Sequence, residues 1–374
     1  MTYSREEACR AWIAYASLNP DALEKLLDEY GSYEDIYDDF VDTQGANMLH
    51  YANNQQMEIL LRQSKREAMH EMLLTLQRHE INIIAKEDSV YPELLRHISD
   101  APPLLFYQGN PNALQKMRYV TMVGSRKASF SGMDSTRRIA KDLSRNGVCI
   151  VSGLAVGIDA AAHEGCLAGG SPTIGVAACG LDVDYPAENA SLKRRILENG
   201  GILLSEAPPG ALALAWKFPI RNRILAGLSH ATLMMEAHIK SGTMSTVHHA
   251  LDQGREVYVF PNDPHSPSGR AAQALLDDGA VCCTCAQDLL EDMKWIRRPS
   301  RKAVAEAMQE PAIPLPTLTE AQAKIYDLLQ TGEQSFDQLA AATGYDAQEL
   351  SGALTMLQIF GLIRSLPGKL YKKS

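Results

Sequence analysis

The fold is decided by two similar stretches, Met122-Val123-Gly124-Ser125-Arg126-Lys127 and Val151-Ser152-Gly153-Leu154-Ala155-Val156-Gly157-Ile158-Asp159. Each begins like a buried strand, breaks at a Gly/Ser turn and leads into a segment with helical spacing. At such a turn a parallel α/β sheet presents backbone N–H groups at a helix N-terminus, where an anion is stabilised. Glycine lets a ligand approach the backbone, and Arg126 and Lys127 add positive charge. The spacing is not the GxGxxG of a dinucleotide site, so we expect a phosphate-binding turn of another kind.

The region around these stretches alternates between short apolar runs and segments with helical spacing. The strand candidates are residues 120–123, 148–151, 173–178, 202–204, 232–235 and 257–260. A helix is predicted over residues 131–146, because Met133, Thr136, Ala140 and Leu143 fall on one of its faces. Regular alternation of strand and helix predicts a mainly parallel sheet that is covered on both faces. The predicted fold class is therefore α/β.

Residues 1–80 predict a small helical domain, of the helix-hairpin-helix kind. Apolar side chains recur at helical spacing over residues 6–16, 20–30 and 57–79, and we expect one helix for each of these segments. The acidic and aromatic segment 33–40 is expected to be a solvated helix edge.

Three further parts follow this helical domain. Residues 81–296 form the predicted α/β domain, and residues 297–316, rich first in Arg and Lys and then in Pro, form a linker. Residues 317–374 contain three helix starts and a hairpin, which is the arrangement of a winged helix. Its capping boxes pair Thr319 with Gln322 and Ser335 with Gln338. The third helix, predicted over residues 346–360, contains no Lys or Arg, so we do not expect it to read DNA directly.

The charge balance limits the classes of partner. The chain of 374 residues has a formal net charge of −9, which argues against a generally basic nucleic-acid binder. The acidity is mostly N-terminal, since residues 1–80 hold 15 acidic and 7 basic residues, whereas residues 120–290 hold 16 and 15. A local basic patch on the central domain is therefore compatible with the total charge.

Membrane, secreted and metal-binding classes are not expected. No window approaches 18 consecutive apolar residues, and the N-terminus is polar and acidic rather than signal-like. Seven cysteines, an odd number, indicate reduced thiols and a cytoplasmic protein. Cys282, Cys283 and Cys285 lack the spacing of a metal site, so we assign them to a strand end and predict no metal.

A second candidate segment is Phe218-Pro219-Ile220-Arg221-Asn222-Arg223. Two guanidiniums beside an amide suit bidentate phosphate contact. Arg221 and Arg223 do not share a helix face, so both can hold one ligand only if the segment begins irregularly. The alternative is a buried ion pair with Glu206 or Glu236, and each arginine can fill a different one of these two roles.

Two other motifs allow both a functional and a structural interpretation. Lys240-Ser241-Gly242-Thr243 precedes a helix and is either a second anion cradle or an ordinary N-cap. His163 lies four residues after Asp159, which could orient it, but no nucleophile is implied. A structural histidine is the favoured interpretation, and no catalytic residue is predicted.

In the order and spacing of its motifs the chain resembles the DprA/Smf family of DNA-processing proteins. The matching motifs include Tyr91-Pro92, Asp100-Ala101-Pro102-Pro103, Gly124-Ser125-Arg126, Ser152-Gly153-Leu154-Ala155, Gly157-Ile158-Asp159, Phe218-Pro219, Arg221-Asn222-Arg223 and Lys240-Ser241-Gly242. The resemblance implies an extended Rossmann-like domain that binds single-stranded DNA and forms a homodimer, flanked by a helical domain and a winged helix. It also implies a role in natural transformation, in which the protein protects incoming single strands and loads RecA on them. It implies neither a cofactor nor an enzymatic activity.

The expected phosphate-binding residues come from three loops. They are Gly124, Ser125, Arg126, Lys127, Gly153, Arg221, Asn222, Arg223, Lys240, Ser241, Gly242 and Thr243. Few aromatic residues are evident in these loops, so we expect contacts to the DNA backbone to outweigh base stacking.

The alternative is a nucleotide-binding or nucleotide-hydrolysing protein. Related Rossmann-like phosphoribohydrolases use a glutamate shortly after a Gly/Thr turn, and the equivalent position here is Thr246. Without that carboxylate the sequence offers no obvious general acid or base, so DNA binding without catalysis is the favoured interpretation.

Overall fold

The computed structural model of the chain consists of two compact units, Met1–Ile296 and Arg297–Ser374. It describes residues 3–115, 117–296, 318–366 and 370–373. The linker predicted over residues 297–316 lies outside the described residues. Each unit has a hydrophobic core of its own.

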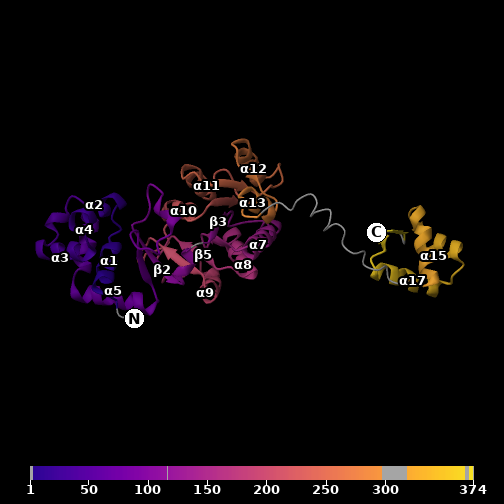
Figure 1. Cartoon of the computed structure of the whole chain (residues 1–374), viewed down its shortest axis with the longest axis horizontal. Coiled ribbons are helices and arrows are strands. Elements are labelled where there is room, and N and C mark those ends of the chain that lie inside the picture. Colours follow the sequence, from indigo (N-terminus) through magenta and orange to yellow (C-terminus); the bar gives the residue numbers. More distant parts are fainter. Residues whose placement is uncertain (1–2, 116, 297–317, 367–369, 374) are drawn as a thin grey trace. The chain divides into compact units, whose positions relative to one another are not determined.

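The first unit is organised around a nine-stranded sheet in the order β1-β2-β6-β5-β4-β3-β7-β8-β9. Figure 1 labels its strands β2, β3 and β5. The strands are β1 (Asn82–Ala85), β2 (Leu104–Gly109), β3 (Arg118–Val123), β4 (Val148–Ser152), β5 (Thr173–Ala177), β6 (Ile202–Ser205), β7 (Ala231–Met234), β8 (Glu256–Val259) and β9 (Val281–Cys282). The seven strands from β6 to β9 in this order are parallel, and β2 and β1 add antiparallel pairs beyond β6. The six predicted strands and the α/β class are confirmed.

Helices cover both faces of this sheet. They are α6 (Glu93–Arg96), α7 (Phe130–Arg145), α8 (Ile158–Gly169), α9 (Ala190–Glu198), α10 (Lys217–Gly227), α11 (Thr243–Asp252), α12 (Pro267–Asp277) and α13 (Ala286–Asp292). The 3₁₀ helices Pro111–Leu114 and Ala187–Asn189 lie in this region, and a third, Ala46–Met48, lies among the N-terminal helices. Alternate residues of β3 enter different cores, because side chains of a strand point to opposite faces. Val120 and Met122 share a core with α7 and α8, whereas Val123 packs with Ile224 and Leu225 of α10.

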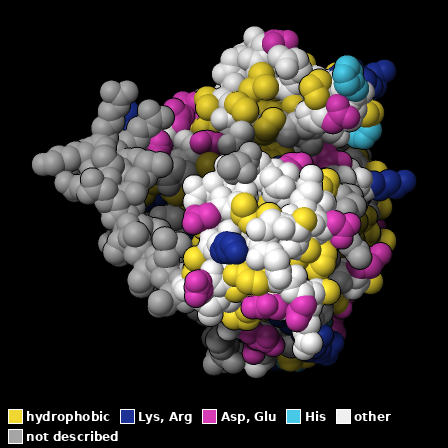
Figure 2. Space-filling model, turned by 90° about the vertical axis from the view of Figure 1, so that its right-hand side faces the viewer, with side chains coloured by type: hydrophobic (Ala, Val, Ile, Leu, Met, Phe, Trp, Pro, Cys, Tyr) yellow, Lys and Arg dark blue, Asp and Glu magenta, His cyan; other side chains and the backbone are white. Residues whose placement is uncertain are grey.

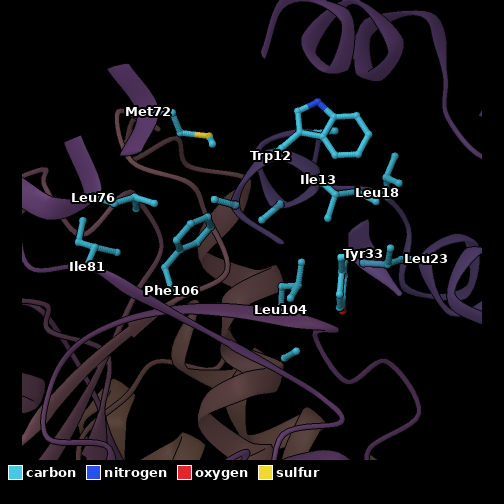
Figure 3. Packing of buried hydrophobic residues seen from close by; sticks show 14 of the residues in the cluster. Trp12, Ile13, Leu18, Leu23, Tyr33, Met72, Leu76, Ile81, Leu104 and Phe106 are labelled. Carbon is cyan, nitrogen blue, oxygen red and sulfur yellow. The ribbon is translucent and has the colours of Figure 1, made fainter. Parts of the chain in front are cut away.

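The N-terminal helices are α1 (Arg5–Tyr15), α2 (Pro20–Tyr30), α3 (Tyr33–Thr43), α4 (Asn54–Gln63) and α5 (Arg66–Arg78). These helices share one hydrophobic core with strands β2 and β6 of the sheet. This core contains Trp12 of α1, Leu76 of α5 and Phe106 of β2 (Figure 3). The helical region and the sheet are therefore packed together within the first unit. The domain boundary at residue 80 stays a prediction.

Two expectations for these helices need correction. The single helix expected over residues 57–79 is two helices, α4 and α5, separated at Ser64 and Lys65. The Tyr37 hydroxyl donates a hydrogen bond to the Ser64 carbonyl oxygen at 3.1 Å, which gives that helix end a tertiary partner. The expected solvated edge at 33–40 is one face of α3 only, since Tyr33 and Phe40 on its other face are buried.

The second unit contains α15 (Glu320–Leu328), α16 (Phe336–Thr343), α17 (Ala347–Ile359), the 3₁₀ helix Leu329–Thr331 and the strands β10 (Gln334–Ser335), β11 (Ile363–Leu366) and β12 (Leu370–Lys373). The strands pair in the order β10-β12-β11. Both predicted capping boxes are present, at Thr319 and Ser335. Three helices and this small sheet form the predicted winged helix. In the part of the chain that the structure describes, every helix is too short or too polar to cross a membrane.

Candidate nucleic-acid interface

The candidate site lies where the strand order reverses. From β3 the chain proceeds through β4 and β5 to β6 on one side, and it then returns to place β7 on the other side of β3. The crevice at the carboxyl ends of β3 and β7 is where open α/β sheets bind ligands. A pocket of about 470 Å³ lies there, and we call it the switch-point pocket. The expected site residues that line it are Gly124, Ser125, Arg126, Arg221, Asn222, Ser241, Gly242 and Thr243.

The turn after β3 is held against the loop after β7 and the start of α8. The Ser125 N–H donates to the Glu236 carbonyl oxygen at 2.6 Å. A Cβ atom on Gly124 would lie 2.5 Å from Ile158, and one on Gly157 would lie 2.3 Å from the Ser125 carbonyl oxygen. Both positions require glycine, because the two turns named at the outset are in direct backbone contact.

Arg126 and Lys127 are exposed at this turn. The Arg126 guanidinium lies 4.8 Å from the centre of the Phe218 ring, and none of the ion pairs among the described residues involves Arg126. Its charge is therefore free for a ligand in the pocket. Lys127 does not line the pocket.

Arg221 is buried and joins the ends of two strands. Its Nη1 donates to the Gly153 carbonyl oxygen after β4 at 2.9 Å and to the Val176 carbonyl oxygen of β5. Burial lowers the pKa of Arg221 to about 10, and the nearby Asp159 carboxylate opposes this effect. A Cβ atom on Gly153 would lie 2.7 Å from Asp159 Oδ2 and 2.8 Å from Arg221 Nη2, so glycine leaves room for both groups. Arg221 thus shapes the pocket wall and contributes charge to it.

Arg223 does not line the switch-point pocket, and its expected phosphate contact stays a prediction. Its guanidinium is buried and forms a bidentate ion pair with Glu206, at 2.9 and 2.7 Å. A further ion pair joins it to Asp100 at 3.1 Å. The ion-pair interpretation with Glu206 therefore applies to Arg223. Glu236 instead accepts hydrogen bonds from the N–H and hydroxyl of Ser129.

The loop after β7 presents an uncapped helix to the pocket. Helix α11 begins after Gly242 without a side-chain cap, so the positive end of its dipole faces the pocket. The Met244 and Ser245 N–H groups donate to the carbonyl oxygens of Ser241 and Gly242 at 3.1 and 3.2 Å, which leaves the Thr243 N–H to meet an anion. Asn222 fixes this loop, because its Nδ2 donates to the Gly242 carbonyl oxygen at 3.2 Å and to Ser245 Oγ at 2.8 Å. Ser241 Oγ is buried with no hydrogen-bond partner among the described residues. Lys240 is exposed beside the loop but does not line the pocket.

Asp159 brings a carboxylate to the same pocket. It is buried at the start of α8, and the Ala155 N–H donates to its Oδ2 at 3.3 Å. Burial raises the pKa of Asp159 to about 6, although the guanidiniums of Arg221 and Arg126 act in the opposite direction. The carboxyl therefore changes charge near neutral pH.

The remaining candidates are structural. His163 is buried, its Nδ1 lies 2.8 Å from Thr173 Oγ1, and burial lowers its pKa to about 3. It is a neutral core residue, and Thr173 rather than Asp159 orients it. Cys282 ends β9, and the described residues contain no cluster of His, Cys, Asp or Glu that could hold a metal.

Comparison with known proteins decides the family. Residues 82–294 match the family model of DNA recombination-mediator protein A, and residues 309–369 match that of the DprA winged helix domain. This chain belongs to the DprA family. It is 32% identical to protein Smf of Escherichia coli over 327 residues, which cover 84% of this chain and 85% of the relative.

Two solved DprA structures are similar to this one. DprA from Streptococcus pneumoniae has a TM-score of 0.64 and 32% identity, covering 78% of this chain and 98% of that one. DprA from Helicobacter pylori, whose structure addresses its single-stranded DNA binding mode, has a TM-score of 0.52 and 28% identity, covering 58% of this chain and 96% of that one.

No role was predicted from the sequence for the aromatic residues around the DprA pocket, although Phe218 lies in a candidate segment. Tyr185 and Phe218 line the switch-point pocket, and their rings are 5.7 Å apart in an edge-to-face contact. Trp216 is 60% exposed nearby. The loops that carry Tyr185 and Trp216 have no strand or helix periodicity. The sequence Trp216-Lys217-Phe218, with a cation between two aromatic residues, is nevertheless typical of a surface that binds single-stranded nucleic acid.

Proposed function

We propose that this DprA protein binds single-stranded DNA by holding a backbone phosphate in the switch-point pocket. The observation that carries the proposal is the convergence of the free Arg126 guanidinium, the Arg221 guanidinium and the uncapped N-terminus of α11 on one crevice. These groups recognise phosphate and carry no base information, so binding is independent of sequence. The finding that DprA from Helicobacter pylori binds single-stranded DNA supports the same role here.

The distribution of charge favours a single strand over a duplex. Residues 120–290 hold 16 acidic and 15 basic residues, so the sheet region has no excess of positive charge. The described part of the face shown in Figure 2 carries acidic side chains with some basic ones among them. A duplex presents phosphates on a broad surface and is matched by a broad basic stripe. Cations gathered in one crevice fit a single strand, whose backbone can enter it.

We further propose that the protein acts as a non-enzymatic recombination mediator in the cytoplasm. It would form a homodimer through the Rossmann-like domain, protect incoming single strands during natural transformation and load RecA on them. This part rests on membership of the DprA family. It is tested by measuring single-strand-dependent ATP hydrolysis by RecA on oligonucleotides that this protein has bound first. No acceleration of RecA assembly would reject the loading role and leave the binding role intact.

Salt dependence tests the binding role. For a phosphate-driven complex the logarithm of the association constant falls linearly with the logarithm of salt concentration, with a slope of about −0.7 for each phosphate neutralised on a single strand. Titration of labelled oligo-dT by fluorescence anisotropy at several salt concentrations measures this slope. A flat dependence would reject the phosphate site.

The nucleotide-hydrolysing alternative has one feature in its favour. Asp159 supplies a carboxylate of raised pKa in the pocket, although position 246 holds a buried threonine. A thermal-shift screen of nucleotides against oligo-dT, followed by product analysis, separates the two functions. Stabilisation by a nucleotide together with base release would favour the enzyme.

A further inference from the structure

A second pocket, of about 370 Å³, lies beside the switch-point pocket, and we call it the apolar pocket. Leu18 between α1 and α2 and Leu23 of α2 line it on one side. Ala178 after β5 and Pro208 after β6 line it on another. Arg221 borders both pockets. The segment 213–221 supplies side chains to both, so it forms the wall between them.

The chemistry of the apolar pocket does not suit a phosphate. Its cation Arg223 is already paired with Glu206, and the Lys217 ammonium lies 5.6 Å from the centre of the Trp216 ring. The Glu206 carboxylate also lines this pocket and repels a second anion, and most of the other walls are apolar and offer an anion no donors. A flat and weakly polar group such as a nucleobase fits these walls.

Trp216 is the most exposed aromatic side chain among those that line the two pockets, and the Lys217 ammonium contacts its ring at 5.6 Å. The Phe218 ring already contacts the guanidiniums of Arg126 and Arg221, at 4.8 and 5.8 Å, and the Tyr185 ring. Trp216 borders the apolar pocket and is 60% exposed. It lies two residues from Phe218, a stretch that spans at most about 7 Å. A strand with a phosphate at Arg126 therefore has a base within reach of Trp216.

We propose that the apolar pocket receives a base of the bound single strand, stacked on Trp216. This inference rests on the proposed function, because the phosphate in the switch-point pocket brings the strand to the site. Stacking accepts any base, so the complex stays independent of sequence. The N-terminal helices become part of the DNA site, since α1 and α2 form one wall of the base subsite.

The test compares oligo-dT with an abasic oligonucleotide of the same length and charge. The wild-type protein should prefer oligo-dT by about five- to a hundredfold, the range for one stacked base. Trp216→Ala should lose most of this preference while its affinity for the abasic strand and its salt slope stay unchanged. Trp216→Phe should retain the preference. Leu212→Ala is the matched control, because Leu212 directly precedes this segment, is 65% exposed and lines neither pocket.

A second variant tests the pocket rather than the ring. Ala207 lines the apolar pocket only, so Ala207→Leu should fill it and lower affinity for oligo-dT but not for the abasic strand. The melting temperatures of both variants show that they are folded. Equal loss on both strands, or no preference in the wild type, would overturn the base subsite while leaving the phosphate site standing. If the wild type binds neither strand, the proposed function fails and this inference fails with it.

Discussion

Arg126 combines exposure with a position at the pocket, so its replacement separates binding from folding. Arg126→Ala should weaken oligo-dT binding by about ten- to a hundredfold, since one charge-assisted contact contributes about 1.5–3 kcal/mol. The melting temperature should hardly change, because exposed substitutions usually alter stability by about 0.5 kcal/mol or less. Anisotropy titration and thermal unfolding of the same preparation measure both quantities. Near-normal affinity with a clear drop in melting temperature would remove Arg126 from the DNA site.

Arg223 offers the opposite case within the same motif. Arg223→Ala should leave oligo-dT affinity within about threefold but lower the melting temperature by several degrees. The physical reason is that Glu206 loses its bidentate partner, and an unpaired polar group of this kind costs about 1–3 kcal/mol. A larger loss of DNA affinity than in Arg126→Ala would mean that Arg223 reaches the strand.

Asp159 makes stability depend on pH. The pKa of the Asp159 carboxyl is about 6 in the folded protein, compared with an ordinary value of 3.8. Between pH 3.8 and pH 6 the carboxyl is therefore protonated in the folded state and ionised in the unfolded state. The contribution to stability is complete below pH 3.8 and is lost as pH rises through 6, a change of roughly 3 kcal/mol. Asp159→Asn should therefore be more stable than the wild type at pH 8 and similar at pH 4. Urea unfolding at both pH values tests this; parallel behaviour of the two proteins would contradict it.

At the scale of single residues, the sequence indicated which interactions the arginines can make but did not indicate which groups each of them contacts. It identified Arg221 and Arg223 and named both a ligand role and an ion pair with Glu206. It could not assign the roles, because residues two apart on a helix point in different directions and only the fold fixes what each one meets. In the structure Arg221 donates a hydrogen bond to the Gly153 carbonyl oxygen after β4, whereas Arg223 forms the ion pair with Glu206. The exposure of Trp216 was equally beyond reach, since it depends on an irregular loop.

Helix α8 provides a matched pair of glycines at its two ends. Gly157 precedes it with φ of 84° and Gly170 follows it with φ of 101°, but only Gly157 is crowded, with a Cβ position 2.3 Å from the Ser125 carbonyl oxygen. Gly170→Ala should cost about 1–2 kcal/mol, the cost of left-handed backbone alone. Gly157→Ala should cost clearly more and weaken oligo-dT binding, because it displaces the turn that carries Arg126. Urea unfolding and anisotropy measure the two effects. Equal costs would show that the two turns can move apart.

The regular elements were predictable where the local pattern agreed with the tertiary environment. Continuous apolar runs located β3 to β8 because both faces of these strands are buried. The break between α4 and α5 was not predictable, because apolar spacing continues across Ser64 and the hydrogen bond from Tyr37 comes from another helix. The convergence of Gly124 and Gly242 on one crevice likewise required the strand order, which periodicity does not contain.

For the whole molecule we predict that DNA binding resides in the first unit. A protein ending at residue 296 should bind oligo-dT within about threefold of the full chain, because residues 1–296 form a compact unit that contains the complete switch-point pocket. The winged helix adds little charge, since α17 contains no Lys or Arg among residues 347–359. Parallel titrations of the two proteins test this. A loss above tenfold would show that the second unit contacts DNA.

The reversal of strand order also determines when the two sides of the pocket become available during synthesis of the chain. The turn at Arg126 emerges from the ribosome early, but the loop at Gly242 and the strand β7 that closes the other side follow about 110 residues later, or roughly 6–22 s at ordinary rates of synthesis. During that interval one edge of β3, which lies inside the finished sheet, has no hydrogen-bonded neighbour and can pair with a strand of another chain. A nascent DprA chain therefore cannot bind DNA in this pocket before most of it has been translated. A ribosome that stalls in this interval leaves an aggregation-prone intermediate and no partly active protein.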